Sequence, residues 1–225
     1  MGDHIRYKIF SHLPLNLDVD ELCIRLRIKK HDATLLKCLK FLINEATEIG
    51  VPKGLYKIAY IEERGKDFIV VDGIRLQSTV LRKNVKESNR VFIFLATCGK
   101  ELADWGVTKK EDLLESFIAD AIQEAACRIA CDQIFEAIDY EYKLKNPSMM
   151  NPGSLSDWPL EQQKPLFEIL EQQNAKIGIN LHESFLMQPV KSVSGIRFPS
   201  ETGFQNCELC PREKCSRRIV PCNKK

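Results

Sequence analysis

An unbroken apolar run from Val91 to Ala96 (VFIFLA) constrains the fold of this chain more than any other segment. The run begins after a charged residue, ends at Thr97-Cys98-Gly99, and is too short for an ordinary helix. Its length and composition are typical of a strand that is buried on both faces. Other elements must then cover the strand above and below, so we predict a layered domain with a candidate site at the end of this strand.

Two long segments follow the period of an amphipathic helix. The first runs from about Asp32 to Ile49, where Gly50-Val51-Pro52 ends it. The second runs from about Glu111 to Tyr142 and carries several alanines that would let another element approach its backbone closely. Glu124 lies beside the apolar stripe of this helix and four residues before Arg128, so a simple ion pair along the helix is one interpretation of it.

The remaining segments complete an α+β pattern. A short helix is predicted from Asp18 or Asp20 through Leu26, and another from a cap at Asp157 to about Asn174. Residues 74–85 are ambiguous between helix and strand. Further strands are predicted at residues 7–13, 55–62, 68–71, 180–187 and 191–198, with a hairpin turn at 64–67.

Residues 146–159 form a stretch dense in Pro, Asn, Ser and Gly, which we predict to be irregular. A connecting loop is the simplest interpretation. The stretch is long for a connector, however, and it contains two methionines, a tryptophan and several amide and hydroxyl groups. It is therefore also a candidate ligand loop.

Four cysteines near the C-terminus, Cys207, Cys210, Cys215 and Cys222, have the spacing C-x2-C-x4-C-x6-C and form a candidate metal site. The short loop of the first pair lets two thiolates reach one metal ion or cluster. Four nearby basic residues would offset the negative charge of such a centre. The spacing fits neither paired zinc knuckles nor the common ferredoxin runs, so an iron–sulfur cluster, zinc and free thiols all stay open. The basic residues are Arg212, Lys214, Arg217 and Arg218.

Composition narrows the class of protein. The chain has 9 cysteines in 225 residues, no leader-like start and no apolar run long enough for a membrane helix, so we expect a cytoplasmic protein with reduced thiols and no membrane partner. Its 33 basic and 31 acidic side chains leave no nucleic-acid footprint. We predict two parts, a domain over residues 1–200 and a cysteine-rich metal-binding tail over residues 201–225.

Several motifs together resemble the activation domain of cobalamin-dependent methionine synthase in a stand-alone form. The segment from Glu183 to Phe198 is similar to the ESFAM…SVSG…F stretch of that family, and residues 96–102 are similar to its ATxGxxL turn. Residues 119–125 resemble its ADxxxEA helix. Asn151-Pro152-Gly153 followed by Asp157-Trp158-Pro159 resembles its proline-glycine ligand loop. The resemblance covers about residues 5–200 and implies a bent, largely antiparallel sheet packed by helices.

The resemblance also implies a site. In that family the domain binds S-adenosylmethionine and presents it to an oxidised corrinoid, which regains its methyl group after reduction. On this chain the matching acidic residue is Glu124, and Asn151, Pro152 and Gly153 match the ligand loop. The facing strand corresponds to Ser192, Val193, Ser194 and Gly195.

The departures from the family pattern concern the ligand itself. The family loop has an arginine just before its proline-glycine turn, whereas this chain has Met149, Met150 and Asn151 there. Without that carboxylate clamp we expect S-adenosylmethionine to bind weakly or not at all. The tyrosine-containing segment after the family's last strand is replaced by the four-cysteine tail.

These observations favour reductive activation of a corrinoid protein, with cobalamin on the partner and an iron–sulfur centre in the tail. The partner would be a corrinoid-binding protein or a cobalamin-dependent methyltransferase. One alternative is an S-adenosylmethionine-dependent reactivation subunit whose tail metal is structural. Another is a non-enzymatic module that binds a corrinoid protein.

Overall fold

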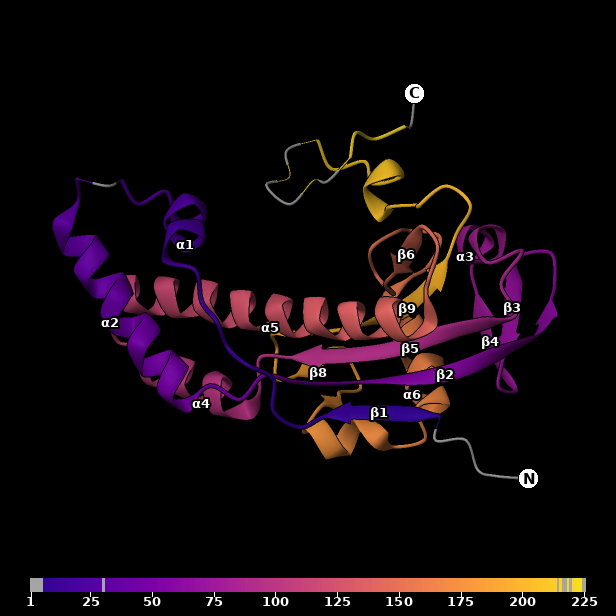
Figure 1. The fold of residues 1–225 in the computed structure, drawn as a ribbon, viewed down its shortest axis with the longest axis horizontal. Helices are drawn as coiled ribbons and strands as arrows, with labels where there is room; N and C mark the ends of the chain where they lie inside the picture. Colours follow the sequence, from indigo (N-terminus) through magenta and orange to yellow (C-terminus); the bar gives the residue numbers. More distant parts are fainter. Residues whose placement is uncertain (1–5, 30, 214, 216–217, 219, 224–225) are drawn as a thin grey trace.

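The computed structural model describes residues 6–29, 31–213, 215, 218 and 220–223. Within these residues the centre is a seven-stranded antiparallel sheet with the strand order β4-β3-β2-β5-β9-β6 and β1 paired to β2 (Figure 1). Two further short strands, β7 (Asn180–Leu181) and β8 (Met187–Gln188), pair with each other. The strands of the main sheet are β1 (Tyr7–Phe10), β2 (Lys53–Arg64), β3 (Phe68–Val71), β4 (Ile74–Gln77), β5 (Arg90–Thr97), β6 (Pro147–Met150) and β9 (Ser192–Pro199).

Strand β5 is the apolar run that the sequence singles out, and it is buried on both faces. Phe92 and Phe94 pack with Ile134 and other residues of the long helix on one face of the sheet. Ile93 and Leu95 alternate with them and join the core on the other face. The prediction of a central strand covered on both faces is confirmed.

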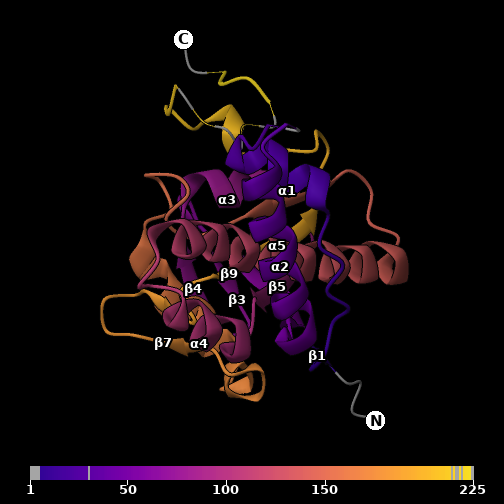
Figure 2. The same ribbon diagram turned by 90° about the vertical axis from the view of Figure 1, so that its left-hand side faces the viewer.

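The helices cover the sheet unequally. Helix α5 lies along one face, and α1, α2 and α4 gather around its first half, as the end view in Figure 2 shows. Helix α6 and its flanking 3-10 turns pack on the other face. The helices are α1 (Val19–Leu26), α2 (Ala33–Ile49), α3 (Thr79–Asn84), α4 (Lys100–Thr108), α5 (Leu113–Tyr142) and α6 (Gln163–Ile169), and the 3-10 turns are η1 (Leu160–Gln162), η2 (Gln173–Ile177) and η3 (Asn206–Glu208).

The sheet bends in its longest strand. The register of β2 against β3 shifts between Ile61 and Glu63, where an extra residue forms a bulge. Beyond this point β3 and β4 run steeply across the direction of β5 in Figure 1. The predicted fold class, α+β with a bent and largely antiparallel sheet packed by helices, is therefore confirmed.

Aspartate caps fix the starts of three helices. Asp18 accepts hydrogen bonds from the backbone at the start of α1, Asp32 does so for α2, and Asp112 does so for α5. Each cap satisfies backbone N–H groups that the first helical turn leaves unpaired. These caps explain why the helices start within two residues of the predicted positions.

Several expectations differ from the structure. Residues 180–187 do not form one strand: they contain β7, a turn and the first residue of β8, because the chain turns back between Leu181 and Met187. The start of the irregular stretch forms the edge strand β6. Asp157 does not cap the following helix, since its carboxylate accepts from Val80 N and Ser78 Oγ at the start of α3. Helix α4 was not expected from the sequence.

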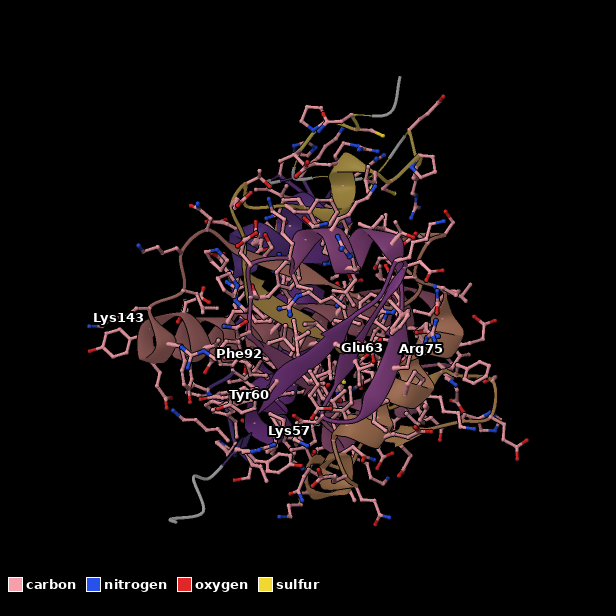
Figure 3. The ribbon with its side chains drawn as sticks, turned by 90° about the vertical axis from the view of Figure 1, so that its right-hand side faces the viewer. Lys57, Tyr60, Glu63, Arg75, Phe92 and Lys143 are labelled. Carbon is pink, nitrogen blue, oxygen red and sulfur yellow. The ribbon has the colours of Figure 1, made fainter. Side chains whose placement is uncertain are left out.

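Lys57, labelled in Figure 3, lies on β2 between β1 and β5 and joins several elements through its side chain. The side chain lies on β2, is 1% exposed, and donates to Ile169 O and Glu171 Oε1, each at 2.7 Å. Its Nζ also lies 3.0 Å from Asp72 Oδ2. Tyr7 OH on β1 donates to the same Glu171 carboxylate at 2.8 Å. Through these contacts, Lys57 and Glu171 hold β1, β2 and the end of α6 together.

Candidate functional site

The loop after β6 is fastened to strand β9 through one side chain. Asn151 Nδ2 donates to Ser194 O at 2.8 Å, and Asn151 Oδ1 accepts from Asn206 Nδ2 at 3.3 Å. Both polar atoms of the amide are therefore occupied. The structure brings together two segments that the resemblance implies for the site, the proline-glycine loop and the strand Ser192–Gly195.

Gly195 is the point of closest approach between this strand and its neighbours. A Cβ atom there would lie 2.6 Å from both Asn151 Nδ2 and Met150 O, and 2.9 Å from Phe94 Cε1. Real Cβ atoms do not come this close, so only glycine lets the loop approach β9 at this position. The sequence pattern, a glycine within a strand, predicts such an approach.

The loop closes on itself just after Asn151. Gly153 has φ +82°, a left-handed conformation that favours glycine, and its N–H donates to Trp158 O at 2.8 Å. Trp158 is fully buried, and Leu155 pairs with it through an isolated bridge. Asp157 ties the same loop to α3. The stretch is a compact, packed loop and not an extended connector.

The other polar side chains of β9 face the body of the protein. Ser192 Oγ lies 2.9 Å from Thr97 Oγ1, at the end of β5, and 2.7 Å from Pro189 O. Ser194 Oγ donates to Gln163 Oε1 at 3.3 Å, and both residues are buried. Val193 packs between the two groups of core residues around α5. These side chains position the strand.

Glu124 lies apart from the loop, on α5 beneath α1. It forms an ion pair with Arg25 of α1, while Arg128 pairs with Glu21 of the same helix. One turn earlier, Asp120 Oδ1 is 2.8 Å from Lys191 Nζ, just before β9. Because residues four apart share a helix face, Glu124 lies on the strip of α5 between the start of β9 and α1.

The described residues of the tail form a small group of turns that carries the cysteines. Cys210 N donates to Cys207 O at 3.4 Å, and Arg218 N donates to Cys215 O at 3.2 Å. The guanidinium of Arg218 also donates to Cys207 O at 3.1 Å and to Cys210 O at 3.4 Å. Asn223 N, next to Cys222, donates to Glu208 O at 2.7 Å. Backbone hydrogen bonds and the Arg218 side chain therefore gather the four cysteine-bearing segments.

The four thiols are half-buried and none forms a disulfide. Within the described ranges, the structure holds no group of three or more His, Cys, Asp or Glu side chains arranged to bind one metal ion. Two of the basic residues noted in the sequence, Lys214 and Arg217, lie outside the described residues. Arg212 and Arg218 are described, and Arg218 holds the turns as given above.

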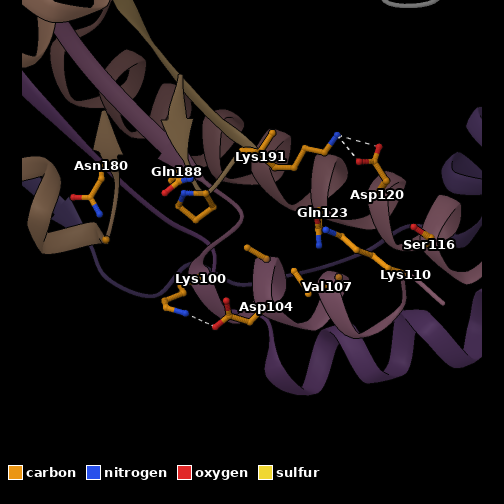
Figure 4. Close-up of a pocket in the computed structure, with 15 residues that line it drawn as sticks. Lys100, Asp104, Val107, Lys110, Ser116, Asp120, Gln123, Asn180, Gln188 and Lys191 are labelled. Atoms are coloured by element: carbon orange, nitrogen blue, oxygen red, sulfur yellow. Dashed lines mark hydrogen bonds and ion pairs between the residues drawn. The ribbon is translucent and has the colours of Figure 1, made fainter. Parts of the chain in front are cut away.

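A cavity of about 510 Å³ lies away from these residues (Figure 4). It is formed by α4, the first half of α5 and the chain around Pro189, with the Lys191–Asp120 pair at its edge. A second cavity, of about 420 Å³, lies between α3, the loop at Leu155–Asp157 and Leu209 of the tail. Among the described helices, none has both the length and the hydrophobicity to span a membrane.

Sequence reasoning missed three residues that hold the site together. Arg25 pairs with Glu124, Gln163 accepts from Ser194, and Asn206 joins the tail to the loop. All three lie far in sequence from their partners, and isolated amide or basic residues carry no local signal. The C-x2-C spacing draws attention to residues 207–210 of the tail but not to Asn206, which immediately precedes them.

One comparison with known proteins bears on the fold. No protein-family model matches the chain, and no curated protein matches it in sequence. Among solved structures, the MetH reactivation domain bound to AdoHcy matches with a TM-score of 0.59 and 14% sequence identity, over 86% of this chain and 78% of that chain. At this identity the match shows the fold. The protein therefore has the fold of a methionine synthase reactivation domain, as the sequence motifs suggested.

Proposed function

We propose that this protein activates a corrinoid protein of methyl transfer by reducing its cobalt, with Cys207, Cys210, Cys215 and Cys222 as ligands of an iron–sulfur centre. The observation that supports this proposal best is the position of the tail. On a reactivation-domain fold, the four-cysteine segment folds directly onto the loop that resembles a ligand loop, through Asn206 and Asn151. A redox centre there would lie directly beside this loop.

Several features of the tail support a thiolate-bound centre, although the side chains of the described residues are not gathered around one metal position. Hydrogen bonds gather the four segments, the thiols are free, and Arg218 brings a positive charge to the carbonyls of the first turn. An iron–sulfur centre held by these thiols would supply one-electron chemistry, giving the electron that takes Co(II) to Co(I) and receiving it from an external low-potential donor. Zinc in the same four thiols would make the tail structural.

A second function is favoured by the matched structure, which holds AdoHcy. This chain would then be an S-adenosylmethionine-dependent reactivation subunit, with a methyl group supplied by the ligand. Glu124 and the loop at Asn151–Gly153 would form its site together with Ser192–Gly195. The engaged amide of Asn151 and the lack of a basic residue in the loop argue for the first proposal.

The test is reduction of cob(II)alamin on a corrinoid-binding protein, followed by visible spectroscopy under anaerobic conditions with a chemical low-potential donor. We expect the iron-loaded protein to produce cob(I)alamin, and Cys210→Ser to abolish this. Cys23→Ser, a half-buried cysteine of α1, is the matched control and should keep the activity. Activity that requires S-adenosylmethionine and survives in Cys210→Ser would support the second function. Binding of the corrinoid protein without any reduction would leave only a docking role.

A further inference from the structure

Exposed apolar side chains gather around the cavity shown in Figure 4. Val107 of α4 and Val190, just before β9, line it and are 58% and 80% exposed. Leu113 and Phe117, in the first two turns of α5, are 87% and 61% exposed. Because residues three apart share a helix face, both lie beside the residues of α5 that line the cavity. Single exposed apolar residues are common, but a group of them around one cavity is typical of a binding surface.

The backbone that carries Val190 is fixed on both sides of it. Cys98 N, at the end of β5, donates to Lys191 O at 3.0 Å. Ser192 Oγ donates to Pro189 O at 2.7 Å. The exposure of Val190 is therefore a property of a held segment, and a partner would meet this side chain in a set position.

Helix α4, which carries Val107, is fixed against α5 in a similar way. Gln123 Nε2 of α5 donates to Leu102 O at 2.7 Å. A Cβ atom on Gly106 would lie 1.8 Å from the same Nε2, so the glycine allows this close approach. Val107 follows directly and points away from the contact, as its exposure shows. Both valines are thus presented by rigid elements.

The charged side chains that line the cavity leave one cation without an ionic partner. Lys100 pairs with Asp104, and Lys191 pairs with Asp120, on separate walls of the cavity in Figure 4. Lys110 also lines the cavity, and no carboxylate of the described residues pairs with it. Since both aspartates are already neutralised, the cavity favours an occupant with a negative charge.

We propose that this surface docks a segment of a partner protein in which apolar side chains flank an acidic residue. The acidic side chain would pair with Lys110, and the apolar side chains would cover Val107 and Val190. A small anion could fill the cavity, but only an occupant that extends beyond it can also cover Leu113 and Phe117. Such docking needs neither the tail thiols nor a corrinoid, so it goes beyond the function proposed above.

Binding of synthetic peptides to the full-length protein tests this surface. The probes are fluorescein-labelled peptides in which leucines flank a glutamate, and fluorescence anisotropy measures their affinity. Lys110→Glu and Val107→Asp should each weaken binding at least about tenfold, because each places a negative charge where the apolar, acidic segment lies. Added salt should also weaken binding to the wild type.

Two exposed residues outside this surface provide matched controls. Lys143→Glu, just beyond the other end of α5, and Ile24→Asp, on α1, should bind the peptides as the wild type does. Both Ile24, which is 79% exposed, and Val107 tolerate a polar side chain, and circular dichroism checks that all variants are folded.

The peptides themselves supply the remaining outcomes. Replacing their glutamate by lysine, or their leucines by serine, should abolish binding. Failure of all the leucine–glutamate peptides to bind the wild type, or equal binding to Lys110→Glu, Val107→Asp and the wild type, would overturn the proposal. Displacement of the peptide by an equal concentration of butyrate would show a small-molecule site and would also overturn it.

Discussion

The side chain of Asn151 decides what the loop after β6 can hold. The resemblance places a carboxylate-binding arginine near this position, but here a neutral amide spans β9 and the tail. Met150, its neighbour, is 1% exposed and belongs to the core. Residues 150–158 contain no basic side chain. A ligand carboxylate would therefore find no charged partner in this loop.

From this we predict that S-adenosylmethionine binds with a dissociation constant above about 100 μM, because one charged bidentate contact is worth roughly 1.5–3 kcal/mol. Calorimetry on the full chain measures this directly. Asn151→Arg should tighten binding about tenfold, even though it breaks the bridge to the tail. Met150→Arg is the contrasting variant and should unfold the protein, since it places a charge in the core. Low-micromolar binding to the wild type would contradict the prediction.

Lys57 is a second residue whose environment gives a measurable effect. Burial alone would lower its pKa, but hydrogen bonds with Glu171, Asp72 and Tyr7 outweigh burial and raise it. Hydrogen bonds from Lys57 and Tyr7 lower the pKa of Glu171. A lysine with a raised pKa stabilises the fold fully below its ordinary value of 10.5 and loses this effect as the pH rises through the raised value. A carboxyl with a lowered pKa stabilises above its ordinary 4.5 and loses the effect as the pH falls.

Urea unfolding at a series of pH values should therefore show stability falling below about pH 4.5 and above about pH 10.5. Glu171→Gln should flatten the acidic fall. Lys57→Met should cost about 2–4 kcal/mol, since it removes the buried partner of Asp72 and Glu171 and leaves Asp72 only its contacts with Arg6 and Tyr60 N. The exposed pair of Lys8 and Glu141 is the matched control, and Lys8→Met should cost no more than about 1 kcal/mol. Equal costs for the two lysines would show that burial of Lys57 is unimportant.

At the scale of elements, the interface of β5 with α5 contains a group of thiols distinct from those of the tail. Burial raises the pKa of Cys98 to about 12. On α5, a hydrogen bond with the Cys131 thiol and burial both raise the pKa of Cys127. Cys127 Sγ also lies 3.8 Å from Ala96 O. These buried cysteines act as small core side chains.

Alkylation followed by mass spectrometry should separate the two groups of thiols. A rise in pKa from 9.0 to about 12 lowers the thiolate fraction of Cys98 about a thousandfold, and burial also blocks access. In the native metal-free protein we expect Cys207, Cys210, Cys215 and Cys222 to react first. Cys98, Cys127 and Cys131 should react only after denaturant is added. Rapid labelling of Cys98 in the native state would rule out this packing.

The same elements show what local sequence can and cannot predict. Helices α2 and α5 are long, periodic and capped, and β5 is an unbroken apolar run. The residues of each segment are therefore enough to predict its secondary structure. The prediction of one strand at residues 180–187 is wrong because β7 is short and pairs with β8, and local propensity does not predict that contact. The prediction that Asp157 caps the following helix is wrong because its carboxylate accepts instead from Ser78 Oγ and Val80 N, at the start of α3.

At the scale of the whole molecule, the motifs predicted which segments would meet but not how they meet. The loop at Asn151–Gly153 and the strand Ser192–Gly195 come together as the resemblance implies. Their joint with the tail depends on Asn206, whose amide matters only because the chain returns over β6. Glu124 and Arg128 of α5 form ion pairs with Arg25 and Glu21 of α1, and no spacing in the sequence predicts these pairs. Local sequence therefore does not predict which residues far apart in the chain come into contact.

The whole-molecule prediction with the widest consequence concerns the metal content of the tail. Anaerobic reconstitution with iron and sulfide, or with zinc, should load one centre per chain on Cys207, Cys210, Cys215 and Cys222. Metal ligation would couple to folding of a segment that has few apolar residues of its own, namely Phe204, Leu209, Ile219 and Val220. Removing one ligand should therefore loosen all the turns that Arg218 and Asn223 now hold.

Cys210→Ser should lower the metal content at least about tenfold, as expected when a thiolate ligand is lost. The thermal unfolding of the body should hardly change, because its core groups are built almost entirely from residues before 200. Cys23→Ser, outside the tail, should keep the full metal content. Iron and sulfide together would support the redox centre, and zinc alone would make the tail structural. If the wild type holds neither metal under any of these conditions, the thiols are not a metal site and the redox proposal falls with them.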